Sequence, residues 1–141
     1  MSASAGTIVT PSFARSTLAI VVGLAINFAF GLGLDQIFHM LGVYPPWGVP
    51  MNDPGDNVLA LSYRIVIALV SCYVAGRIAP WAPMRHALIL GGIGFALSTL
   101  GALAASQMAL GPLWYPLALV AVTLPCAWLG GALARRALAR G

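Results

Sequence analysis

The fold is decided by the stretch from Ser16 to Leu34, which reads STLAIVVGLAINFAFGLGL and contains no charged residue. A helix rises about 1.5 Å per residue, so it needs about 20 predominantly apolar residues to cross a hydrocarbon layer about 30 Å thick. We expect this stretch to form the core of a helix over residues 16–41. A secretory signal has an apolar core of only about 7–15 residues. The sequence therefore predicts a retained first membrane helix.

Three further stretches satisfy the same criterion, over residues 57–78, 86–108 and 113–133. The segments between them are rich in proline and glycine, which end helices. Each stretch should be helical, because an unpaired backbone group in lipid costs several kcal/mol. The predicted fold class is all-α. The whole chain, residues 1–141, is expected to form a single membrane domain, a polytopic bundle of four transmembrane helices.

The composition excludes an ordinary water-soluble protein. Hydrophobic residues make up 60% of the chain and charged residues 7%, whereas a soluble domain has about 25% charged residues. The net charge of +4 comes from arginines spread over short segments between apolar runs, so we expect the lipid bilayer, and not nucleic acid, as the partner. Cys72 and Cys126 lie inside apolar runs, where we expect them to pack as small hydrophobes.

The arginines predict the orientation of the chain. Positively charged residues favour the cytoplasmic side of a membrane. Six of the seven arginines fit one assignment, in which both termini and the middle connector face the cytoplasm: Arg15, Arg77, Arg85, Arg135, Arg136 and Arg140. Lysine is absent while alanine, glycine and arginine are abundant, a composition typical of GC-rich bacterial genomes. We therefore expect a multi-pass protein of a bacterial inner membrane with both termini cytoplasmic.

Small residues recur on one face of the third predicted helix. Gly94, Ser98, Gly101 and Ala105 follow at intervals of four, three and four, which predicts a face that a neighbouring helix can approach closely. Small pairs near the predicted cytoplasmic ends extend this pattern: Ala75-Gly76, Gly91-Gly92 and Gly130-Gly131. The alternative is that glycine and alanine are simply common throughout this chain.

Arg64 is the only charged residue deep inside a predicted span, roughly 10 Å from its outer boundary at about 1.5 Å per residue. An arginine at depth costs about 2.5 kcal/mol or more unless it has a partner or reaches the headgroups. Asp35, near the outer end of the first span, is the nearest acidic candidate. We expect an intramembrane ion pair between them. The pair either fixes the register of the two helices or forms part of an anion or proton site; otherwise Arg64 extends to the headgroups.

Asp35 and His39 are spaced i, i+4, so they share a helix face. Together with Asp53 and Asp56 they offer ligands for a metal at the outer surface, but the chain lacks a signature such as His-Glu-x-x-His. We therefore assign no metal ligand, no cofactor and no catalytic residue. A membrane enzyme with an outer-facing Asp35–His39 site is the third alternative for the function.

One short segment resembles other proteins. The sequence Ser71-Cys72-Tyr73-Val74-Ala75-Gly76-Arg77-Ile78-Ala79-Pro80, followed by Pro83-Met84-Arg85-His86-Ala87, is similar to a helix end and cytoplasmic turn in several groups of small uncharacterised prokaryotic four-helix membrane proteins. Those proteins typically read Gly-Gly-Tyr-x-Ala-Gly-Arg-x-Ala, and then His-Gly or His-Ala opens the next helix. Ser71-Cys72 stand here in place of the paired glycines. The resemblance implies the same topology and no particular activity.

The sequence thus favours a non-catalytic structural or accessory membrane protein, one that associates with copies of itself or with another membrane protein. The alternative is a small oligomeric transporter or channel, for which Arg64 would suit an anion. Ion-coupled transport normally uses an acidic residue near mid-membrane, and no aspartate or glutamate lies there.

Overall fold

A computed structural model describes residues 12–141 of the chain. It contains four helices, α1 (Phe13–Met40), α2 (Pro54–Ile78), α3 (Pro83–Gln107) and α4 (Trp114–Arg140), and the described residues form no strand. All four helices are long and apolar enough to cross a membrane. The predicted all-α bundle is therefore confirmed, and the chain is a multi-pass membrane protein.

The helices extend beyond the predicted spans where local chemistry allows it. α2 and α3 each begin with a proline, which suits the first helical turn because that turn needs no N–H donor. The Asp53 carboxylate caps α2 by accepting hydrogen bonds from the backbone N–H groups of Gly55 (2.7 Å) and Asp56 (3.2 Å). α4 continues to Arg140, well beyond the predicted end at residue 133, because its alanines, leucines and arginines are good helix formers.

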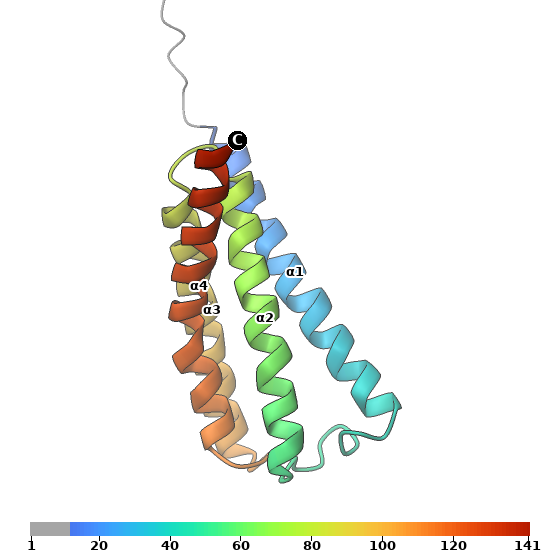
Figure 1. The fold of residues 1–141 in the computed structure, drawn as a ribbon. Helices are drawn as coiled ribbons and strands as arrows, with labels where there is room; N and C mark the ends of the chain where they lie inside the picture. Colours follow the sequence, from blue (N-terminus) through green and yellow to red (C-terminus); the bar gives the residue numbers. More distant parts are fainter. Residues whose placement is uncertain (1–11) are drawn as a thin grey trace, which may run out of the picture.

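The helices converge at one end of the bundle and separate at the other (Figure 1). The first end holds the start of α1, the turn between α2 and α3, and the end of α4; we call it the arginine end. The second end holds connectors 41–53 and 108–113; we call it the connector end. α2 contacts all three other helices, whereas α1 contacts α2 and α3 but not α4 within the described residues. α1 leans away from α2 toward the connector end.

The half of the bundle nearer the arginine end is closely packed through glycines. A Cβ atom added at Gly91 would lie 2.2 Å from the Cβ of Ala127, and one at Gly130 would lie 2.8 Å from the backbone oxygen of Leu69. Gly23 leaves room for the end of the Leu90 side chain of α3 against α1. Close approach through small residues is how helices associate in lipid, where burial of apolar surface provides little driving force.

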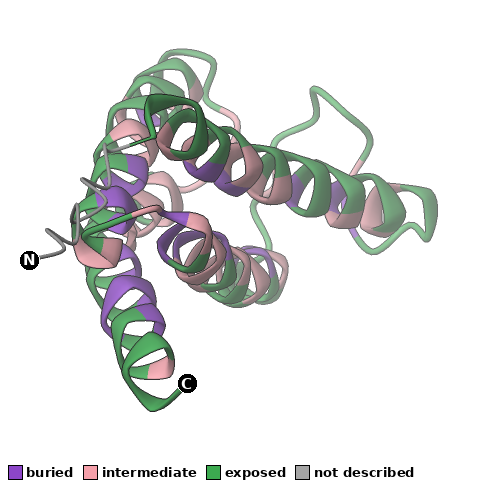
Figure 2. Cartoon of the chain, turned by 90° about the horizontal axis from the view of Figure 1, so that it is seen from above, coloured by how far each residue is buried: buried purple, intermediate pink, exposed green. Residues whose placement is uncertain are grey.

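The outward surface of the bundle is apolar. Large hydrophobic side chains on all four helices are exposed, including Phe30, Val66, Leu100 and Trp128. Figure 2 shows the buried positions as short stretches that turn toward neighbouring helices, while the outward faces are exposed. α1 is the least buried of the four, with 17% of its most apolar window buried against 33% for α4. The exposed surface is thus suited to contact with lipid tails.

Candidate functional site

A cavity of about 550 Å³ lies in the half of the bundle nearer the connector end. Residues of all four helices line it, as do residues 44–49 and 110–113 of the two connectors. The lining is largely apolar, and its polar side chains include Asp35, Arg64 and Tyr115. The volume lies within the range of about 300–1,000 Å³ that is usual for small-molecule sites. The cavity is therefore the leading candidate for a functional site.

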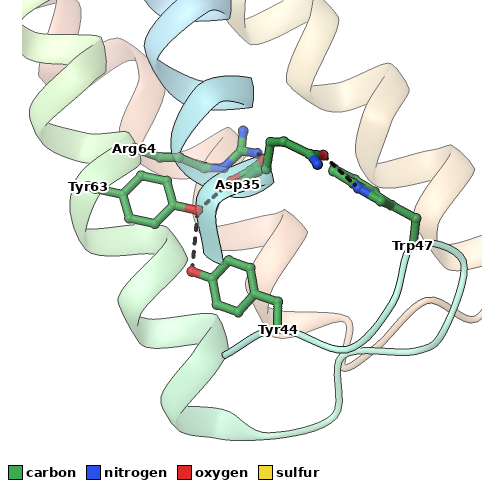
Figure 3. Close-up of polar contacts among 6 residues, drawn as sticks. Asp35, Tyr44, Trp47, Tyr63 and Arg64 are labelled. Atoms are coloured by element: carbon green, nitrogen blue, oxygen red, sulfur yellow. Dashed lines mark hydrogen bonds and ion pairs between the residues drawn. The ribbon is translucent and has the colours of Figure 1, made fainter. Parts of the chain in front are cut away.

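Asp35 of α1 and Arg64 of α2 form an ion pair in the wall of this cavity (Figure 3). The carboxylate is nearly buried, with 10% of the Asp35 side chain exposed, whereas 33% of the Arg64 side chain remains exposed. The Tyr63 hydroxyl donates a second hydrogen bond to Asp35, at the carboxylate oxygen that Arg64 does not use. Asp35 therefore has a donor on each oxygen and ties α1 to α2.

The Tyr44 hydroxyl donates a hydrogen bond of 3.2 Å to the Tyr63 hydroxyl, which extends the cluster into connector 41–53 (Figure 3). Burial raises the pKa of Tyr44 above its ordinary value, because removal from water disfavours the charged phenolate. Tyr44 is consequently a neutral donor. The chain Tyr44–Tyr63–Asp35–Arg64 forms a polar network that joins the connector to both helices.

The guanidinium of Arg64 has donors to spare. Its hydrogen bond to Asp35 uses Nη2, while Nε is buried and has no partner among residues 12–141. A buried donor without an acceptor is costly, and more so when the group is charged. Nη1 makes no hydrogen bond among residues 12–141, and 33% of the Arg64 side chain is exposed. Arg64 is therefore able to donate from Nη1 to an acceptor that enters the cavity.

The connectors form a roof over the cavity. The His39 ring donates from Nδ1 to the Pro45 carbonyl oxygen at 2.6 Å, and the ring lies 4.0 Å from that of Trp47, centroid to centroid. Trp47 Nε1 donates to Gln36 Oε1 at 3.0 Å. The backbone N–H of Met51 donates to the Leu110 carbonyl oxygen at 2.9 Å and joins the two connectors. The cavity is thus covered at the connector end.

All four small residues singled out on α3, Gly94, Ser98, Gly101 and Ala105, line the cavity. A Cβ atom at Gly94 would lie 3.2 Å from Thr123 Cγ2, whereas one at Gly101 would meet no described atom within 4 Å. This face of α3 therefore approaches α4 at Gly94 and borders open space at Gly101.

The structure separates the residues considered as metal ligands. His39 donates a hydrogen bond to the Pro45 carbonyl oxygen in the connector, and Asp53 caps α2. Asp56 lies in the first turn of α2 and not in the loop. Residues 12–141 contain no group of three or more side chains able to hold a metal ion.

The six arginines used to predict orientation all belong to segments at the arginine end (Figure 1). Arg15 Nε donates to the Ile78 carbonyl oxygen at 2.8 Å, so it links α1 to the end of α2. The Arg85 guanidinium lies over the Trp81 ring, 5.2 Å from its centroid. Arg64 stands apart from this group, in the other half of the bundle.

Sequence reasoning missed three tyrosines of the site. Tyr63 and Tyr44 complete the hydrogen bonding of the cluster, and Tyr115 lines the cavity at the start of α4. Tyr63 directly precedes the single intramembrane arginine, which was an available signal. The positions of Tyr44 and Tyr115 depend on how the connectors fold over the cavity, and no local pattern indicates this.

Together, the helices and the cavity define a multi-pass membrane protein with a covered, largely apolar compartment and a polar cluster in its wall. Comparisons of the chain with protein families, with curated proteins and with solved structures find no match. The cavity is therefore the feature of the chain that points to a function.

Proposed function

We propose that this protein is a non-catalytic accessory component of a bacterial inner membrane, and that it holds another membrane constituent in its cavity. The cavity is the main support for this proposal, since it has the volume of a ligand site and a charged donor in its wall. The polar residues support a structural role over a catalytic one. Asp35 is occupied by Arg64 and Tyr63, and His39 is bonded to Pro45.

In this proposal the arginine end faces the cytoplasm and the roof of the cavity faces the opposite side, in accord with the positive-inside rule. The constituent held in the cavity is a lipid, a membrane-protein partner or a second copy of the chain. Its attachment would stabilise the connector half, where α1 separates from the other helices.

Site-specific photo-crosslinking in intact membranes tests the proposal. A crosslinker at Ser98 faces the cavity, whereas one at Leu100, which is 63% exposed and does not line the cavity, serves as the matched control on the same helix. We expect a single adduct of defined mass from position 98 and a broad mixture of bulk lipids from position 100. The same broad mixture at both positions would contradict the proposal.

A small oligomeric anion transporter is the second candidate, favoured by the location of Arg64 in the cavity wall. Chloride flux into liposomes containing the purified protein would test it. Transport through the cavity requires that Arg64→Ala abolish the flux while Arg77→Ala, at the arginine end, leaves it unchanged. The close packing at Gly23 and Gly91 favours the accessory role, because it closes the cavity toward the arginine end.

A further inference from the structure

We propose that the cavity binds a membrane amphiphile, with a slender apolar chain along α3 and an ionised phosphate or carboxylate head at Arg64. This inference rests on the proposed function and gives the chemical class of the constituent held. It draws on the shape of the cavity, its closed ends and the unused donors of Arg64.

The length and the lining of the cavity suit an apolar chain. Its lining on α3 extends from Gly91 to Ser106, a length of about 22 Å at about 1.5 Å per residue. The volume of about 550 Å³ lies in the range usual for small-molecule sites. A long, largely apolar lining of this kind suits an extended hydrocarbon chain.

Both ends of the cavity are closed. At the end nearer the arginines, Gly91 packs on Ala127 and Gly23 packs on Leu90. At the other end, the Met51–Leu110 hydrogen bond joins the connectors. A helix that crosses the whole bilayer would have to pass one of these ends. An amphiphile needs only to enter sideways between α1 and α3, which diverge toward the connector end (Figure 1).

The head is assigned to Arg64 because this residue has a fixed charge and donors that the chain leaves unused. Asp35 is held by both Tyr63 and Arg64, so it does not require the whole guanidinium (Figure 3). Nη1 makes no hydrogen bond among the described residues, and 33% of the Arg64 side chain remains exposed. Phosphate and carboxylate oxygens make the short, charge-assisted bonds that arginine prefers. Either head would satisfy the spare donors below the roof.

Native mass spectrometry of the delipidated full chain in a non-ionic detergent tests the proposal with three probes. These are phosphatidylglycerol, palmitic acid and inorganic phosphate. We expect one bound molecule per chain for at least one amphiphile, and none for inorganic phosphate, which lacks the chain. Binding of phosphatidylglycerol alone would identify a phospholipid, and binding of palmitic acid alone a fatty acid. Binding of neither amphiphile, or of phosphate only, would overturn the proposal.

Two glycines of α3 provide a matched pair of variants. A Cβ meets nothing within 4 Å at Gly101, which lines the cavity, or at Gly92, which does not. Gly101→Leu should weaken amphiphile binding about tenfold or more, because the loss of two buried methylene contacts is sufficient for that factor. Gly92→Leu should bind like the unaltered protein. Equal binding by the two variants would overturn the proposal.

Arg64→Gln tests the head separately, with an expected loss of about tenfold or more when a charge-assisted hydrogen bond is removed. Unchanged affinity would remove the assignment of the head to Arg64. Should this variant fail to fold, the comparison of Gly101→Leu with Gly92→Leu still tests whether an amphiphile binds in the cavity. A defined polypeptide adduct at Ser98 without amphiphile binding would overturn this inference and leave the proposed function intact. If position 98 gave no defined adduct of any kind, both the proposed function and this inference would be overturned.

Discussion

The two halves of the bundle use the same residue type in opposite ways. In the half near the arginine end, Gly91 and Gly130 lie where any added Cβ would collide with a neighbouring helix. In the half near the connector end, Gly31 and Gly101 border space that no described atom fills within 4 Å. The same small residue thus permits contact in one half and leaves a cavity in the other. Whether a glycine contacts a neighbouring helix therefore depends on how close the two helices lie at its level.

Among the variants that test this contrast between the two halves, Gly130→Leu should cause the largest loss in the free energy of unfolding. The added side chain would start 2.8 Å from the Leu69 backbone oxygen and 2.9 Å from the Tyr73 backbone nitrogen, neither of which can move aside alone. Overpacking of a tight interface costs about 1–3 kcal/mol and occasionally more, so we expect a loss of about 3 kcal/mol. Unfolding in mixed detergent micelles measures it. A stability equal to that of the unaltered protein would show that the packed half is not tight.

The next largest loss of stability is expected when the ion pair between α1 and α2 is broken. Asp35→Asn removes the charge that Arg64 and Tyr63 share, and we expect a loss of about 2 kcal/mol, less than for a fully buried pair because Arg64 is one-third exposed. The charge swap Asp35→Arg with Arg64→Asp should recover part of the stability that each single change loses. Strictly additive losses in the double variant would exclude coupling between the two residues.

A smaller loss of stability is expected from a change in connector 41–53, where Tyr44 joins the polar network. Tyr44→Phe keeps the ring against Phe38, with centroids 5.3 Å apart, and removes only the hydroxyl that donates to Tyr63. Hydrogen bonds in membrane proteins average about 0.6 kcal/mol, and we expect a loss of that size in the same unfolding assay. A loss comparable to that of Asp35→Asn would instead place Tyr44 at the centre of the network.

The smallest effect is expected from leucine at the two open glycines of α3. Gly92→Leu and Gly101→Leu should each change the free energy of unfolding by less than about 0.5 kcal/mol, as is usual where no close contact is altered. Measured beside Gly130→Leu, they sharpen the contrast between the halves. A strong destabilisation by Gly101→Leu alone would mean that α1 closes on α3.

The sequence was sufficient for the helices and for part of the site. The four spans follow from hydropathy alone, since lipid enforces a helix wherever the chain crosses it. Pairing Arg64 with Asp35 needed only the rule that an intramembrane charge requires a partner, and the structure brings the two together. The cavity could not be predicted, because it depends on the lean of α1. That lean involves contacts between residues that are distant in the sequence, such as Gly23 with Leu90.

The cavity requires that α1 separates from α3 toward the connector end, and distances between spin labels in lipid nanodiscs measure this separation. Cys72 and Cys126 would be replaced by alanine so that labels attach only at introduced cysteines. One label pair is at Val21 and Ile89, which line a small pocket between α1 and α3 near the arginine end. The other is at Ile37 and Leu103, both exposed, nearer the connector end. We expect a clearly longer distance for the second pair; equal distances would show that α1 and α3 do not separate.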